Sequence, residues 1–128
     1  MHARTREWVD KAEEDYAATL KLNEPQQALY GSVCFHAQQC IEKYAKAFLT
    51  EHDAEFPRTH NMNFLHSACL SLEPKLADYA KDFDQLNDYS VDIRYPGISA
   101  SAEDANEAIE AMKRIRTFIR TKLDLPEE

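Results

Sequence analysis

The segment from Pro25 to Glu51 constrains the fold most, because a helix formed by it would be apolar over more than half of its circumference. At ~100° per residue, one broad arc of that helix carries Val33, Cys34, Ala37, Ile41, Tyr44, Ala45, Phe48 and Leu49, with Phe35 at its edge. The opposite arc is polar and holds His36, Gln39, Lys43, Lys46 and Thr50. A helix this apolar must contact more than one neighbour, so we expect it at the centre of a helical bundle or in a dimer interface.

The rest of the chain also favours helices over strands. Two glycines among 128 residues are too few to supply the positive-φ turns of a hairpin-rich fold. Apolar residues at helical spacing predict four long helices and one short helix. In chain order these are about Thr5–Leu22, Pro25–Glu51, a short helix after the loop His52–Thr59, a helix that begins with Pro74 and carries Leu86, and a helix from Ser101 to Leu123.

Local signals mark the helix ends and the longest loop. Thr5 is expected to cap the first helix, and Thr59 or Asn61 the short one. Ser101 and Asp104 have the spacing of a capping box. The proline-glycine pair within residues 90–100 predicts a loop there. The predicted fold class is therefore all-α: an up-and-down bundle of four or five helices, in one domain over residues 1–128 with a core from about 5 to 123.

Charge and composition exclude several classes of function. A net charge of −8 argues against a generic nucleic-acid binder, so any contact with RNA needs a local basic patch. The basic second half of the last helix is better explained by its match to the helix dipole than by RNA binding. Cys34, Cys40 and Cys69 form no CxxC pair, and no apolar run reaches the roughly 20 residues of a membrane span. We expect a cytoplasmic protein with reduced thiols, no membrane contact, no cofactor and no metal site, because metal-ligand pairs and a glycine-rich phosphate loop are absent from the sequence.

Gln38 and Glu42 do not fit the two arcs of the central helix. Both fall on its apolar side, one turn apart, where an unpaired polar group would cost a few kcal/mol. They either make structural hydrogen bonds, for instance across a dimer, or line a polar cleft. The sequence leaves both interpretations open.

Three segments in order carry a resemblance to a known family. The first is HAQQCIEKYAKAFL, which contains the alanine-glutamine-glutamate-lysine pattern; the second is THNMNFL; the third is DIRYPG. Together they resemble the HEPN domain family, the "higher eukaryotes and prokaryotes nucleotide-binding" domain. The resemblance extends from about Thr5 to Leu123 and implies a four- or five-helix bundle, usually a homodimer, with a cleft that receives nucleotide or RNA.

The same resemblance implies a partner and a set of site residues. Many members of the family act with a minimal nucleotidyltransferase, some as toxin–antitoxin modules. The residues that it assigns to nucleotide or RNA binding are Arg94, Tyr95, His60, Lys43 and Lys46, with Gln38 and Glu42 in support or at an interface. An arginine can grip phosphate bidentately, a tyrosine can stack on a base, and a histidine at a helix start is well placed for an anion. Each also has an ordinary structural explanation, such as pairing of Arg94 with a nearby aspartate or a backbone hydrogen bond from His60.

Catalysis is a separate question. Active members of the family are metal-independent ribonucleases in which a histidine follows an arginine after four to six intervening residues. In this chain Arg94 is followed by no histidine, and His66 comes one residue too late after Arg58. The chain therefore resembles the branch that keeps arginine-tyrosine-proline without an intact ribonuclease motif. Three hypotheses stay open: a nucleotide- or RNA-binding protein with a nucleotidyltransferase partner, a degenerate ribonuclease, and a non-catalytic helical adaptor.

Overall fold

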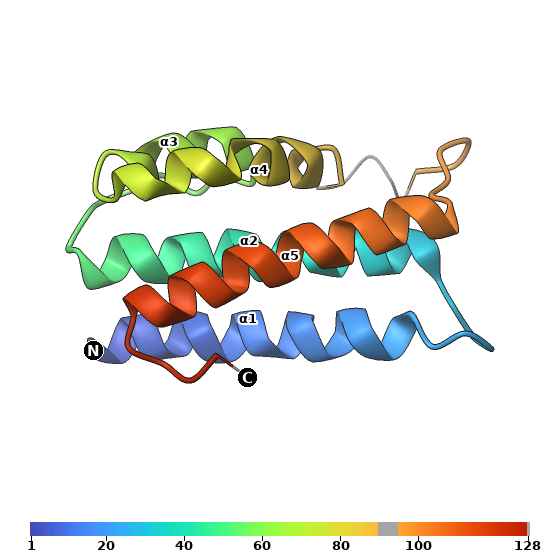
Figure 1. Ribbon diagram of the computed structural model, residues 1–128, viewed down its shortest axis with the longest axis horizontal. Coiled ribbons are helices and arrows are strands. Elements are labelled where there is room, and N and C mark those ends of the chain that lie inside the picture. Colours follow the sequence, from blue (N-terminus) through green and yellow to red (C-terminus); the bar gives the residue numbers. More distant parts are fainter. Residues whose placement is uncertain (90–94, 128) are drawn as a thin grey trace.

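The computed structural model describes residues 1–89 and 95–127. Their helices are α1 (Ala3–Leu22), α2 (Tyr30–Glu51), α3 (Met62–Leu70), the short 3₁₀ helix η1 (Pro74–Tyr79), α4 (Ala80–Asn87) and α5 (Ala102–Lys122). α1 and α2 run antiparallel side by side, α5 packs on α2, and α3 and α4 form a layer on the side away from α1 (Figure 1). The predicted all-α bundle is confirmed.

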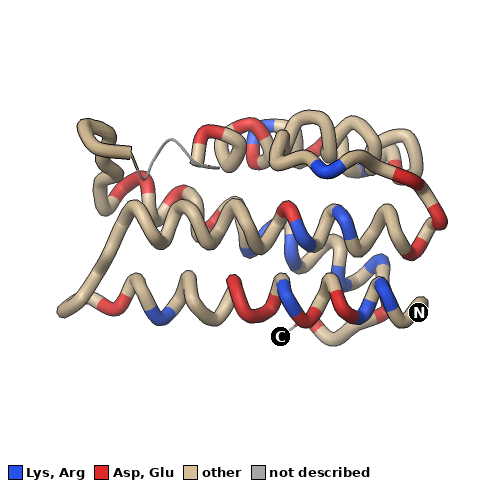
Figure 2. Tube along the Cα trace, turned by 180° about the vertical axis from the view of Figure 1, so that it is seen from behind, with Lys and Arg blue, Asp and Glu red and all other residues tan. Residues whose placement is uncertain are grey.

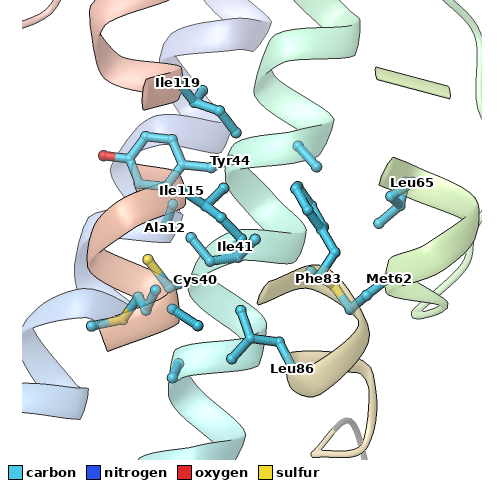
Figure 3. Close-up of a cluster of buried hydrophobic side chains, with 14 of the residues drawn as sticks. Ala12, Cys40, Ile41, Tyr44, Met62, Leu65, Phe83, Leu86, Ile115 and Ile119 are labelled. Carbon is cyan, nitrogen blue, oxygen red and sulfur yellow. The ribbon is translucent and has the colours of Figure 1, made fainter. Parts of the chain in front are cut away.

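α2 occupies the centre of the bundle, as its broad apolar arc predicts. It contacts α1, α3, α4 and α5, and its apolar residues from Val33 to Leu49 are almost all buried. Ile41 of α2 meets Phe83 of α4 and Ile115 of α5 in the core (Figure 3). Burying one side chain of this size stabilises a fold by about 1.5–3 kcal/mol. The many buried side chains of α2 therefore make a large contribution to the hydrophobic stabilisation of the bundle.

All three cysteines are free and buried in this core. Burial raises the pKa of the Cys34 thiol to about 12, with a further contribution from Asp104, and burial alone raises that of Cys69 to about 12. Cys34 and Cys69 are therefore packing groups of the core, as the place of Cys34 on the apolar arc of α2 predicts.

Two predicted helix starts are confirmed by side-chain caps. The Asn61 side chain accepts a hydrogen bond from the Phe64 N–H at 3.0 Å and begins α3. Thr59, the alternative cap, instead accepts from the Asn61 N–H at 3.1 Å. Ser101 and Asp104 form the predicted capping box of α5, with the two bonds at 3.1 and 2.9 Å.

Two other predicted starts are wrong. α1 begins before Thr5, which is buried within the helix and does not cap it. α2 begins at Tyr30, not at Pro25, because the chain must reverse direction between two antiparallel helices. The Leu29 N–H closes that reversal by donating to the Leu22 carbonyl at 3.0 Å. The segment after Pro74 also differs, since it starts as η1 and becomes α-helical only in α4.

The predicted loop over residues 90–100 is described from residue 95 onward and contains no helix there. The Ile98 N–H donates to the Tyr95 carbonyl at 3.1 Å, closing a turn around Pro96 and Gly97. Gly97 has φ +89°, a conformation that glycine adopts without strain and that a type II turn requires at this position.

Among the helices that the structure describes, none combines the length and apolarity needed to cross a membrane.

Candidate functional site

Glu42 is the centre of the candidate site. Its side chain is only 3% exposed in the middle of α2, so its carboxylate needs partners. Its oxygens lie 3.0 Å from Lys46 Nζ, 2.9 Å from His60 Nδ1 and 3.2 Å from Gln38 Nε2. Gln38 and Lys46 stand one turn to either side on the same helix, whereas His60 comes from the loop before α3. We call these four residues the Glu42 cluster; all four are among the residues that the sequence analysis selected.

His60 is the member of the Glu42 cluster that faces solvent, with a side chain 67% exposed. Its backbone carbonyl accepts a hydrogen bond from Gln38 Nε2 at 3.4 Å, which ties the loop to α2. Because a carboxylate can only accept, Nδ1 carries the proton in the contact with Glu42, and Nε2 is the ring nitrogen left for a ligand. A histidine held in this way suits proton transfer or anion binding.

Lys46 is less accessible than its position on the polar arc suggested. Its Nζ lies 3.0 Å from Glu42 and 5.5 Å from the centre of the Trp8 ring, and the side chain is buried. The packing of α1 against α2 covers this part of the polar arc. Lys46 therefore neutralises Glu42 and makes a cation–π contact with Trp8.

Lys43 belongs to a different cluster. Its Nζ contacts the carboxylate of Asp15, a buried residue of α1, and His36 Nδ1 lies 2.8 Å from the other oxygen of that carboxylate. The structure thus does not bring Lys43 into the Glu42 cluster. Sequence reasoning missed Asp15, although a signal was present: Asp15 continues the helical stripe through Trp8 and Ala12 and interrupts its apolar character.

The remaining two predicted residues, Arg94 and Tyr95, follow α4 in the sequence. Arg94 is outside the described residues, and Tyr95 is 61% exposed at the start of the turn. The side chain of Asn87, the last residue of α4, accepts a hydrogen bond from the Met62 N–H at 2.8 Å. The end of α4 is therefore held against the start of α3, two residues from His60.

The basic half of α5 is largely occupied by structural contacts. Arg116 makes two hydrogen bonds of 2.8 Å with Glu13 of α1 and packs on the Tyr16 ring, 3.8 Å from its centre. Arg120 donates to the Tyr44 hydroxyl at 2.8 Å. Burial alone would raise the pKa of Glu13, but hydrogen bonds from Arg116 and Tyr44 and the attraction of both arginines lower it. This network, unseen in the sequence, joins α1, α2 and α5.

Most lysines and arginines gather toward the end of the bundle that holds the N-terminus (Figure 2). Several are paired with acids: Arg114 binds Asp82 at 2.8 Å, and Lys122 lies 3.1 Å from Glu73. The end of the bundle is therefore rich in cations but not uniformly positive.

Comparison with known proteins agrees with this architecture. The HEPN domain family model matches residues 5–122. The chain is similar to the crystal structure of TT1696 from Thermus thermophilus, with 22% sequence identity, a TM-score of 0.77 and coverage of 94% of this chain and 99% of that one. It is also similar to ST0689, an archaeal HEPN homologue, with 24% identity, a TM-score of 0.72 and coverage of 93% and 97%. These two structures support the fold alone, and no curated protein matches the chain. Because the family model spans nearly the whole sequence, the chain belongs to the HEPN domain family.

Proposed function

We propose that this HEPN-family protein binds a nucleotide or RNA at the Glu42 cluster. The observation that carries the proposal is the contact of the buried Glu42 carboxylate with His60 Nδ1, 2.9 Å long, beside a largely exposed imidazole. A carboxylate this deeply buried holds the ring in one orientation, so His60 Nε2 presents a fixed hydrogen-bonding group to the solvent. A phosphate oxygen is a suitable partner for that nitrogen when the ring is protonated.

Arg94 and Tyr95 complete the proposed site. The chain leaves α4 at Asn87, whose side chain is hydrogen-bonded to Met62, two residues after His60, and Arg94 follows Asn87 by seven residues in sequence. In this proposal Arg94 grips a phosphate and Tyr95, which is exposed, stacks on a base.

The two lysines contribute unequally in this proposal. Lys46 adds positive charge directly beside Glu42. Lys43 would have to exchange its contact with Asp15 for one with the ligand, so we expect it to contribute less.

Calorimetry with ATP and with a short single-stranded RNA tests the proposal. We expect the wild-type protein to bind at least one of them, and both Arg94→Ala and His60→Ala to weaken binding by about 10-fold or more, the effect of losing a charged hydrogen bond. His52→Ala is the matched control, because His52 is also an exposed histidine but lies at the far end of α2. Equal affinities for the wild type, His60→Ala and Arg94→Ala would contradict this site.

One observation favours ribonuclease activity as a second candidate function. The Glu42–His60 pair has the form of an oriented acid–base histidine, and exposed Arg58 lies two residues before His60 in sequence. In this scheme His60 would accept the proton of a ribose 2′-hydroxyl as its oxygen attacks the adjacent phosphorus. The bond from that phosphorus to the 5′-oxygen of the next nucleotide breaks, a 2′,3′-cyclic phosphate forms, and His60 returns the proton to the departing 5′-oxygen. The test is cleavage of a labelled RNA in the presence of a metal chelator. Activity that is lost in His60→Ala and retained in His52→Ala would support it, and an inactive wild type would reject it.

We also propose that the protein works as a homodimer with a minimal nucleotidyltransferase partner, in a toxin–antitoxin-like module. Leu29 and Ile98 are among its most exposed apolar side chains and line the same shallow hollow, the kind of surface that a protein partner covers. Light scattering gives the oligomeric state, and co-expression with a candidate nucleotidyltransferase tests the complex. A stable complex without any ligand binding would instead favour the non-catalytic adaptor.

A further inference from the structure

A hollow of about 450 Å³ lies on the outer face of α1, near its N-terminus. Its lining residues are Arg4, Glu7, Trp8 and Lys11. They stand three or four positions apart, so they share one face of the helix. None of them belongs to the Glu42 cluster.

Trp8 forms the aromatic wall of this hollow. The ring is only partly buried and is held from behind by two contacts: Phe56, at 6.3 Å between ring centres, and Lys46 Nζ, at 5.5 Å from the centre of the Trp8 ring. A tryptophan whose position is fixed by such contacts, while part of it lines a hollow, is a ready surface for stacking. Aromatic side chains in such positions bind bases of any sequence, because each base has a π-face.

The charged residues around Trp8 favour an anionic ligand. Arg4 and Lys11 are exposed on either side of it, and Glu7 is the one acid of the lining. Arg4 and Glu7 form an ion pair of 2.9 Å, but their side chains are 73% and 69% exposed, so solvent screens the pair and a ligand can displace it. The lining therefore has a positive formal charge on a chain whose net charge is −8.

We propose that this hollow is a nucleobase subsite, in which a base stacks on Trp8 and the phosphates beside it contact Arg4 and Lys11. The proposal rests on the proposed nucleotide or RNA binding and specifies where a base is held. Lys46 links the two places, since the same ammonium group contacts the Trp8 ring and lies 3.0 Å from Glu42. In this proposal one ligand extends from the Trp8 hollow to His60, which contacts the same Glu42 carboxylate.

The chain offers a direct probe of this subsite, because Trp8 is its only tryptophan. Tryptophan emission is followed while ATP, or a short single-stranded RNA, is added to the wild-type protein, and the same titrations are repeated by calorimetry. We expect the ligand to quench the tryptophan emission, with a saturation curve that gives the same Kd as calorimetry. A mononucleotide site predicts comparable affinities for the two ligands, whereas an RNA site predicts tighter binding of the RNA.

Variants test whether the emission change comes from contact in the hollow. Trp8→Ala should weaken binding roughly 5- to 100-fold, the range found when a stacking side chain is lost. Trp8→Phe, which keeps an aromatic ring, should lose less affinity for the ligand. It serves as a control in case Trp8→Ala fails to fold. Lys11→Ala should weaken binding several-fold and reduce its salt dependence, whereas Lys21→Ala, an exposed lysine at the other end of α1, should not.

The outcomes separate this inference from the proposed function. If a ligand binds and His60→Ala weakens it, but Trp8 emission is unchanged and Lys11→Ala binds like the wild type, the subsite is wrong and the Glu42 site stands. If emission and Lys11→Ala respond while His60→Ala has no effect, the hollow binds the base and the Glu42 site is wrong. If neither ligand binds the folded wild-type protein, both proposals are wrong.

Discussion

Lys46 and Glu42 form a buried ion pair. Replacing one partner should lower the unfolding free energy strongly, whereas replacing both by apolar residues should change it little. Lys46→Met keeps the stem that packs beside Trp8 but leaves the Glu42 carboxylate, 3% exposed, without its cation. Losing one partner of a buried pair costs about 3–5 kcal/mol of unfolding free energy. Since His60 and Gln38 still bond the carboxylate, we expect the lower end, about 3 kcal/mol. Glu42→Leu should cost a similar amount, because it leaves the ammonium unpaired.

The double variant Glu42→Leu/Lys46→Met should recover most of that loss. Replacing both members of a buried ion pair by apolar residues of similar size removes the cost of taking two charges out of water. We therefore expect the double variant to lie within about 1 kcal/mol of the wild type, which corresponds to a coupling of about 5 kcal/mol or more between the two positions.

Urea unfolding followed by circular dichroism measures these differences. For a chain of this length each kcal/mol corresponds to roughly 3 °C in Tm, so each single variant should melt about 10 °C below the wild type. Single losses under about 1 kcal/mol that simply add in the double variant would refute the reasoning, because they would mean that water already screens the pair. The recovered double variant should still bind ligand poorly, since His60 has lost the carboxylate that orients it.

Three further changes test other parts of the structure. Arg116 lowers the pKa of Glu13 in the folded protein, so the stabilisation from this pair is present above the unfolded pKa of about 4.3 and is lost as pH falls through the lower folded value. The difference in unfolding free energy between wild type and Arg116→Ala, measured by urea titration, should therefore shrink from about pH 6 to about pH 3. A difference that stays constant over this range would contradict the pairing. Cys34 and Cys69, whose pKa values burial raises to about 12, should react with a thiol reagent only as fast as the protein unfolds; rapid labelling under native conditions would mean that the core opens locally. Gly97→Ala should cost about 1 kcal/mol, because alanine is strained at φ +89° although nothing lies within 4 Å of the added carbon; an unchanged urea midpoint would show that the turn relaxes.

The sequence determined where most helices lie and which of them is central. The caps at Asn61 and Ser101 depend on residues within about four positions of one another, and the apolar arc of α2 follows from helical spacing alone, so both can be predicted without any tertiary contact. The start of α2 was misjudged because the length of a reversal depends on how two helices pack, not on the residues inside it.

The sequence alone predicted only part of the candidate site, because contacts between helices depend on how the helices pack. Gln38 and Glu42 stood out as polar residues on an apolar face, but their partner His60 is 18 positions beyond Glu42, in a loop whose path the local sequence does not specify. Lys43 and Lys46 share the polar arc of α2, yet Lys43 contacts Asp15 of α1, whereas Lys46 contacts Glu42 one turn earlier on its own helix. Helical periodicity predicts contacts within one helix, such as the one between Glu42 and Lys46. It cannot predict that Lys43 meets Asp15 or that Glu42 meets His60, because those partners come from other parts of the chain and only the packing of the helices brings them close.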